Sequence, residues 1–319
     1  MTRTAAALLS TLLLIATPAP AADQGAADAL AQAKSEIDTY YGDVQHLNRA
    51  APLLLKALSA EPGNAAIYVQ AARLTIKGGH VVASQFKPGT VEAYNELIDK
   101  ALALDPALQK AHILKAEVHD IRRQYEQERL SLERARALGE SDPWLWVGYA
   151  RYYLKMGQSN QAFSTYLRVM RMGPGQGPEE RNAYVGALNE LAGFTLRPED
   201  GVTLQDLGRR VREARHPQDA WALGNFAEQV LWRGMFDEAI DFSREALKTR
   251  DYGAARLTLA AALYGKAADQ ILLKQESGVQ ALLDEAAALG VSRQRILQHL
   301  AEDTPEARRR APVLERIVR

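Results

Sequence analysis

Apolar side chains recur at intervals of three and four residues along most of this chain of 319 residues. That spacing places them on one face of a helix, and no segment alternates convincingly with the period of two that is typical of a strand. Residues 81–84 are the only strand-like exception. The pattern predicts an all-α protein that is about three-quarters helical and has no sheet.

The clearest periodic segment comprises residues 143–177. Within it, small and aromatic residues occupy regularly spaced positions: Trp146, Tyr149, Ala150, Tyr153, Gly157, Ala162, Tyr166 and Pro174. A small residue lets two helices approach closely, and an aromatic ring fills the space beside it. We expect Gly157 to end a first helix in the left-handed conformation and Pro174 to stop a second helix.

These residues resemble a tetratricopeptide repeat, a unit of 34 residues that consists of a helix, a turn and a second helix. Only Tyr149 and Val169 depart from the usual pattern, which has Leu and Ala at those positions. The resemblance implies a right-handed α-solenoid, in which each repeat packs on its neighbours. Such repeats are scaffolds with many unrelated uses, so the fold does not identify a partner.

Counting from Pro143 in steps of 34 residues divides the chain into about seven units, which start near residues 31, 65, 109, 143, 177, 220 and 254. The count leaves two groups of surplus residues, 80–90 and 193–202, which we interpret as insertions between the two helices of a unit. Asp38 falls where the repeat has a small residue, as a degenerate terminal unit allows. We expect the array to cover residues 22–302.

The last segment, residues 303–319, is predicted to be a C-terminal capping helix. Thr304, Pro305 and Glu306 form a signal for the start of a helix. We interpret the three arginines at positions 308–310 as part of a solvated face; the alternative is that they bind an acidic surface.

The first segment, residues 1–21, is typical of a secretory signal peptide. A basic start precedes an apolar run at residues 5–16, and the small residues Ala19 and Ala21 fit a cleavage site. The run is too short to span about 30 Å of hydrocarbon, although an uncleaved anchor is the alternative. The chain has no cysteine to carry a lipid. We therefore expect a mature chain from about Ala22, periplasmic or secreted, with no membrane span.

Composition narrows the function further. The 39 acidic side chains balance the 39 basic ones, whereas a nucleic-acid-binding protein would have a basic excess. The absence of cysteine excludes disulfides, thiol catalysis and thiolate metal sites. His112 and His119 could share a helix face, but they lack a metal-ligand spacing. We find no catalytic motif, and we expect no enzyme activity, no cofactor and no metal.

The resemblance implies that the first helices of successive repeats line a concave groove. The side chains that would face it, our candidate partner-binding residues, are Arg73, Lys77, Lys110, Trp144, Arg151, Lys155, Arg181, Asn182, Asn189, Trp221, Asn225 and Trp232. Glu117, Asp120 and Glu228 project onto the same face. The Lys and Asn pattern by which some family members clamp a terminal carboxylate is not matched here.

Three tryptophans, Trp144, Trp221 and Trp232, project into this groove, whereas Trp146 occupies a packing position. Large aromatic rings near Arg and Asn are typical of binding hot spots. The alternative is that Trp144 and Trp221, which have equivalent positions in their units, cover the edge of the preceding repeat.

Three functions remain open at this point. The first is a non-catalytic periplasmic scaffold that binds an extended peptide or another protein in the groove between the third and sixth repeats. The second is a structural component of a cell-envelope assembly, such as a secretion, pilus or polysaccharide-export apparatus. The third is an enzyme or an enzyme accessory protein that acts on cell-wall glycan. The pattern does not predict an oligomeric state.

Overall fold

The computed structural model describes residues 24–82, 85–275, 277–301 and 304–318. The expected signal peptide lies outside the described residues. The part of the chain that the structure describes is 77% helical, with 16 helices in a repeated arrangement, so the prediction of an all-α fold is confirmed. Contacts divide the chain into two compact units, which are described separately below. Unit 1 ends at Met172 and also contains residues 176–180; unit 2 contains residues 173–175 and continues from Arg181.

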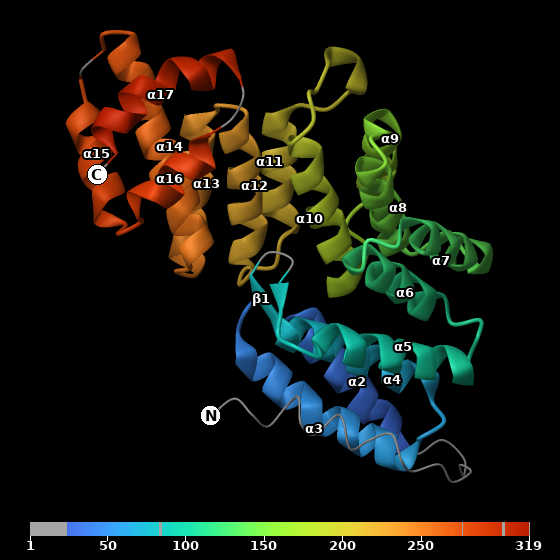
Figure 1. Ribbon diagram of the computed structural model, residues 1–319. Coiled ribbons are helices and arrows are strands. Elements are labelled where there is room, and N and C mark those ends of the chain that lie inside the picture. Colours follow the sequence, from blue (N-terminus) through green and yellow to red (C-terminus); the bar gives the residue numbers. More distant parts are fainter. Residues whose placement is uncertain (1–23, 83–84, 276, 302–303, 319) are drawn as a thin grey trace. The chain divides into compact units, whose positions relative to one another are not determined.

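Unit 1 is a series of helix pairs (Figure 1). Its elements are α2 (Gln24–Asp38), α3 (Val44–Ala60), α4 (Ala65–Gly79), β1 (His80–Val82), β2 (Gln85–Phe86), α5 (Thr90–Leu104), α6 (Gln109–Ile121), α7 (Tyr125–Leu138), α8 (Pro143–Lys155), α9 (Ser159–Met172) and the first turn of α10 (Pro178–Ala192). The strongest contacts join α2 to α3, α4 to α5, α6 to α7 and α8 to α9. Each such pair is the helix, turn and helix of one repeat.

Short polar side chains set the starts of these helices. Asp43, Asn64 and Asp142 each accept a hydrogen bond from the backbone N–H two residues further on. Such a cap satisfies one of the N–H groups that the first turn of a helix leaves without a partner. The sequence therefore fixes the helix starts locally.

The turn between two paired helices needs a residue in the left-handed conformation. Gly157, as expected, has φ 70°, and Gly234 has φ 71° at the same place in its own pair. Arg123, 34 residues before Gly157, has φ 57° without being glycine. This turn is thus retained where the residue type is unfavourable, because the packing of the two helices fixes it.

The first insertion contradicts the prediction that the chain has no sheet. Strands β1 and β2 pair as an antiparallel hairpin in which His80 lies opposite Phe86. The two rings contact edge to face, with centroids 5.7 Å apart, and the Lys87 N–H donates to Gly79 O at 2.8 Å. A hairpin this short satisfies its backbone groups locally, so a strand-like stretch too short to predict a sheet can still form one.

Unit 2 continues the pattern of paired helices (Figure 1). Its elements are the rest of α10, the 3-10 turn η2 (Pro198–Asp200), α11 (Leu204–Ala214), α12 (Ala220–Trp232), α13 (Phe236–Thr249), α14 (Gly253–Leu272), α15 (Val279–Ala288), α16 (Arg293–Leu300) and α17 (Pro305–Ile317). Helix α14, with 20 residues, is the centre of this unit and contacts α12, α13, α15, α16 and α17. The second insertion lies between α10 and α11.

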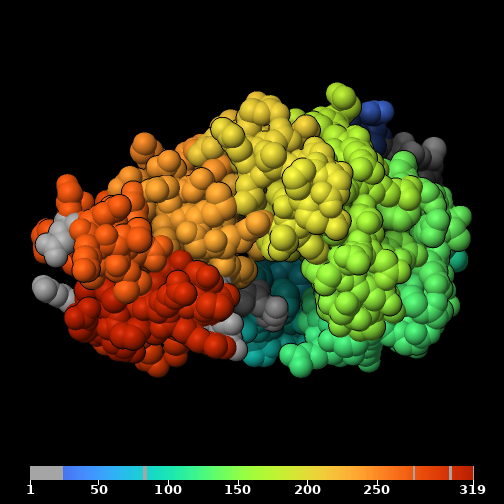
Figure 2. Space-filling model, turned by 90° about the horizontal axis from the view of Figure 1, so that it is seen from above, coloured from blue at the N-terminus to red at the C-terminus, as the bar shows by residue number. Residues whose placement is uncertain are grey.

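Helix α17 covers α14 at the end of unit 2. The red surface of the last helices lies against the orange surface of the helices that precede them (Figure 2). Thr304 caps α17 through the N–H of Ala307, as the sequence predicts. The expectation of solvated arginines is wrong for Arg310, whose guanidinium donates to Asp269 at 2.6 Å and lies 4.8 Å from the ring centroid of Phe236. An arginine can bury its planar group against an aromatic ring while it keeps an ion pair.

Candidate functional site

A groove of about 210 Å³ lies among the first helices of unit 1, α4, α6 and α8. Its apolar wall consists of Ile76, Ile113, Leu114, Ala116, Val147 and the ring of Trp144. Its charged groups are Arg73, Lys77, Lys110, Glu117, Asp120, Glu128, Arg151 and Glu179. An apolar wall with a few converging charged groups is the usual composition of a binding site.

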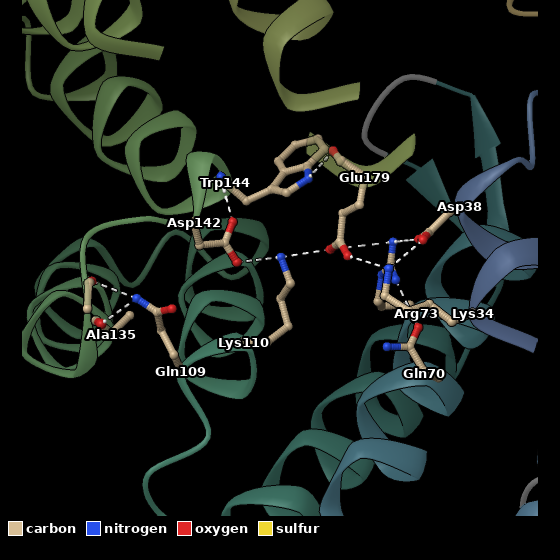
Figure 3. A network of polar contacts seen from close by, with 11 residues as sticks. Lys34, Asp38, Gln70, Arg73, Gln109, Lys110, Ala135, Asp142, Trp144 and Glu179 are labelled. Carbon is tan, nitrogen blue, oxygen red and sulfur yellow. Dashed lines mark hydrogen bonds and ion pairs between the residues drawn. The ribbon is translucent and has the colours of Figure 1, made fainter. Parts of the chain in front are cut away.

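One carboxylate organises one end of the groove (Figure 3). Glu179, in the first turn of α10, lies 2.7 Å from Lys110 Nζ, 3.1 Å from Lys34 Nζ and 3.7 Å from Arg73 Nη2. These cations come from three successive first helices. Burial opposes the charge on Glu179, but Lys110, Arg73 and Lys34 outweigh it and lower the pKa of Glu179 to about 2.

Two more carboxylates complete this group, which we call the Glu179 cluster: Lys34, Asp38, Arg73, Lys110, Asp142 and Glu179. Asp38 accepts from Lys34 and from Arg73, both at 2.6 Å, and its exposed fraction is 2%. Lys110 donates to Asp142 at 2.7 Å. Asp38, which the sequence presents as a defect of a terminal repeat, is therefore a buried partner for two cations.

Trp144 lines the groove and also packs against another part of the chain. Its ring lines the groove, and its indole N–H donates to the backbone oxygen of Glu179 at 3.1 Å. Asp142 also caps the Trp144 N–H at 2.9 Å. The ring therefore contacts the segment that follows its repeat.

Lys77 differs from the other cations of the groove. Among the residues that the structure describes, no carboxylate lies within ion-pair distance of its ammonium, and the ring centroid of Tyr40 lies 5.6 Å away. Burial, with a smaller contribution from Arg73, lowers the pKa of Lys77 to about 8. A desolvated ammonium without a counter-ion remains at the groove.

Carboxylates line the other end of the groove. The Tyr94 hydroxyl donates to Glu117 Oε2 at 2.6 Å, and burial raises the pKa of Tyr94. Lys155 pairs with Asp120 and, at 3.2 Å, with Glu128. Burial raises the pKa of Glu128 despite Lys155. This end of the groove therefore has more acidic than basic side chains.

Within unit 1, the structure brings predicted site residues together. Arg73, Lys77, Lys110, Trp144 and Arg151 line one groove, and Lys155 is joined to it through Asp120 and Glu128. The remaining candidates belong to unit 2: Arg181, Asn182, Asn189, Trp221, Asn225 and Trp232.

Asn189 does not face solvent, contrary to the prediction for this residue. It is buried, and its amide donates to Ala222 O at 3.2 Å, because α10 approaches α12 closely enough for the side chain to satisfy a helix carbonyl. Trp221 and Trp232 are 36% and 44% exposed. Beside Trp232, burial lowers the pKa of His299 and raises that of Glu228.

Four residues of the Glu179 cluster were not among the predicted site residues: Lys34, Asp38, Asp142 and Glu179. Glu179 follows Pro178 at a helix start, where an acidic residue is ordinary. Asp38 had a usable signal, because a charge on an otherwise apolar helix face implies a buried partner. The two histidines that could share a helix face contact different groups: His112 Nε2 lies 2.9 Å from Pro106 O, and His119 Nδ1 lies 2.9 Å from Gln124 Oε1. The described residues contain no group of three potential ligands.

Comparison with known proteins finds likeness in structure alone. No family model and no curated protein matches the sequence. A chain of the APC/C hetero-tetramer Cut9–Hcn1 aligns with 14% identity and a TM-score of 0.50, over 91% of this chain and 52% of that one. The human IFIT1 dimer with PPP-AAAA aligns with 14% identity and a TM-score of 0.51, over 80% and 58%. YrrB, described as a TPR protein with an unusual peptide-binding site, aligns with 16% identity and a TM-score of 0.36, over 77% and 96%.

The two likenesses with TM-scores of 0.50 and 0.51 agree with the helix pairs and the 34-residue spacing of the turns described above. The chain has the tetratricopeptide-repeat fold. It spans little more than half the length of the Cut9–Hcn1 and IFIT1 chains, and at 14% identity the likeness concerns the fold alone. None of the described helices of this tetratricopeptide-repeat chain combines the length and the apolar character needed to cross a membrane.

Proposed function

We propose that this chain is a non-catalytic scaffold that binds an extended segment of a protein partner in the groove of unit 1. The observation that carries the proposal is an apolar wall, formed by residues such as Ile113 and Val147, beside the ammonium of Lys77. The apolar wall supplies area to bury, and the charged groups orient what is buried. Tetratricopeptide repeats are used widely as interaction scaffolds.

We propose a non-catalytic role because most charged side chains of the groove are paired with groups of opposite charge or with hydrogen-bond donors. Lys155 lies between Asp120 and Glu128, and Glu117 accepts from Tyr94. The described residues that line the groove include no serine, threonine, cysteine or histidine to serve as a nucleophile. Ion pairs of this kind hold a surface in one shape, which suits binding.

We also propose that the chain is exported and cleaved after Ala21. The support is the basic, apolar and small-residue pattern of residues 1–21. Mass spectrometry of the protein from an envelope fraction should give a chain that starts at Ala22. A chain that keeps its first residues, or one confined to the cytoplasm, would contradict this part of the proposal.

Peptide selection tests the groove. Random peptides displayed on phage would be selected against residues 22–319, and the selected peptides would be measured by calorimetry against two groove variants, Leu114→Glu and Arg151→Glu. Leu138→Glu is the matched control, because Leu138 is a 43% exposed leucine on α7 and does not line the groove. We expect both groove variants to weaken binding about tenfold or more, with the control unchanged.

Circular dichroism would establish that each variant is folded, and Arg151→Glu provides the answer if Leu114→Glu is unstable. Full binding by both groove variants would exclude the groove as the site. A failure to select any peptide would argue against peptide recognition by this chain.

A further inference from the structure

We propose that the unit 1 groove recognises an acidic side chain of its partner, and that Lys77 is the group that binds the carboxylate. The inference rests on the proposed function and specifies the chemistry of the bound segment. It assigns to the partner one glutamate or aspartate, flanked by apolar residues.

The ion pairs at this end of the groove distinguish Lys77 from the neighbouring cations. Lys34 is 2.6 Å from Asp38, Arg73 is 2.6 Å from the same carboxylate, and Lys110 is 2.7 Å from Glu179. Each of these three cations therefore has an acidic partner within the chain. Lys77, on the same helix as Arg73, has none among the described residues.

The carboxylates that act on Lys77 are already engaged, because Asp38 accepts from Arg73 and Glu179 lies 2.7 Å from Lys110. Glu117 lines the same groove, but it accepts the Tyr94 hydroxyl at 2.6 Å. A desolvated ammonium without a counter-ion raises the free energy of the unbound protein. An arriving carboxylate removes this cost and breaks no existing ion pair, so the gain from charge pairing is available to the ligand.

The surroundings of Lys77 favour a single negative charge. Asp38 from α2, Glu117 from α6 and Glu179 from α10 all act on its ammonium, and Arg73 lies on its own helix. The three carboxylates would repel a doubly charged phosphate more strongly than a carboxylate. Ile76 and Ile113 supply apolar surface for the aliphatic part of the acidic side chain or for its neighbours.

Glu179 shows how this surface receives a carboxylate. Its side chain, carried by a neighbouring segment, reaches cations on three first helices and keeps a pKa of about 2 (Figure 3). Glu179 thereby pairs with Lys34, Arg73 and Lys110, and Lys77 is left as the place for a further acid. We therefore assign the ligand to an acidic side chain of an extended segment.

A double-mutant cycle tests the assignment on the whole mature chain. Each selected peptide would be made acetylated and amidated, so that side chains carry its only carboxylates, and in matched forms with Glu or Gln at one position. The protein variants are Lys77→Met, Lys77→Arg and, as a control for net charge, Lys56→Met on the exposed surface of α3.

We expect the change from Glu to Gln at one position to weaken binding about tenfold in the unaltered chain and in Lys56→Met. In Lys77→Met the Glu and Gln peptides should bind alike, and Lys77→Arg should retain the preference for Glu. Circular dichroism checks that all variants are folded.

Selected peptides that bind in the groove with no preference for Glu would overturn this inference and leave the proposed function standing. A preference for Glu that persists in Lys77→Met would place the carboxylate elsewhere and overturn it too. A phosphoserine peptide that binds more tightly than its Glu counterpart would contradict the single-charge site. The absence of any groove-dependent peptide would overturn both proposals.

Discussion

The two units of this chain connect successive helix pairs by different chemistry. In unit 1, side chains from α2, α4, α6 and α10 meet in the Glu179 cluster, where ion pairs join one repeat to the next. In unit 2, neutral side chains that bind backbone carbonyls make such links: Asn189 donates to Ala222 O and the Tyr252 hydroxyl donates to Ala220 O, both at 3.2 Å.

Aromatic and alanine packing supplies the rest of unit 2. The rings of Phe226 and Phe242 have centroids 4.5 Å apart, and α14 buries a run of alanines. Unit 2 also has ion pairs, such as Arg244 with Glu285, but both of these side chains are more than a third exposed. Exposed pairs contribute little to stability.

The comparison teaches that one repeat fold can be held by titratable or by neutral contacts. Carbonyl oxygens keep their charge state at every pH, whereas Glu179 and its partners do not. The Glu179 cluster also orients cations beside the groove of unit 1. This groove is where we propose that the partner binds. The four predictions below test this contrast.

The largest effect is expected from Trp146→Ala in unit 1. Trp146 is 6% exposed, its indole N–H donates to Glu140 O at 2.9 Å, and the Arg168 guanidinium lies 3.4 Å from its ring centroid. Loss of the ring should cost about 3 to 5 kcal/mol. Hydrogen exchange should show faster opening in unit 1 and little change in unit 2. Equal acceleration of both units would mean that they unfold together.

The next effect is expected from Glu179→Gln, which leaves three cations without their shared carboxylate. It should cost about 3 kcal/mol at neutral pH. The folded-state pKa of Glu179, about 2, lies below its ordinary value of 4.5. Its contribution is therefore present above pH 4.5 and is lost as the pH falls from 4.5 through 2.

Urea unfolding of both proteins between neutral and acidic pH measures this difference. The free energies of the two proteins should converge in acid. Glu245→Gln in unit 2 is the matched control, because Glu245 pairs with Arg212 and Arg215 while it is 33% exposed. If Glu245→Gln lowered the free energy of unfolding more than Glu179→Gln, the proposed difference between the two units would be reversed.

A smaller effect of opposite sign is expected from Lys77→Met. The folded-state pKa of Lys77, about 8, lies below its ordinary 10.5, so its charge destabilises the fold at neutral pH. The variant should be more stable by about 1 to 3 kcal/mol. This cost is full below pH 8 and disappears as the pH rises to 10.5, so the two proteins should converge in alkali. Thermal unfolding measures it, with Lys56→Met as the control; a destabilised Lys77→Met variant would contradict the account of Lys77.

The smallest effect is expected from Trp221→Ala in unit 2. Trp221 holds the same place in α12 that Trp144 holds in α8, and it is 36% exposed. We expect a loss of about 1 kcal/mol or less. Urea unfolding provides the measurement. A loss of about 3 kcal/mol would mean instead that Trp221 seals a junction between repeats.

The sequence by itself determined the helices, their pairing in repeats and the turns between them. These features depend on residues that are close along the chain: the period of the apolar positions, the caps at Asp43 and Asn64, and Gly157 at φ 70°. The sequence marked residues 81–84 as strand-like but did not predict the hairpin of β1 and β2. Its five strand residues carry too weak a pattern to outweigh the helical period around them.

Only the tertiary structure decided which charges compensate one another. Asp38 and Glu179 lie far apart in the sequence, and each looked ordinary or defective there, yet both bind the same cations. Asn189 looked like a surface amide until α12 placed a carbonyl beside it. Lys77 looked like its neighbours until Lys34, Arg73 and Lys110 were each found beside an acid. Periodicity reports which face of a helix is buried, whereas the energy of a buried charge depends on distances across repeats that no local pattern contains.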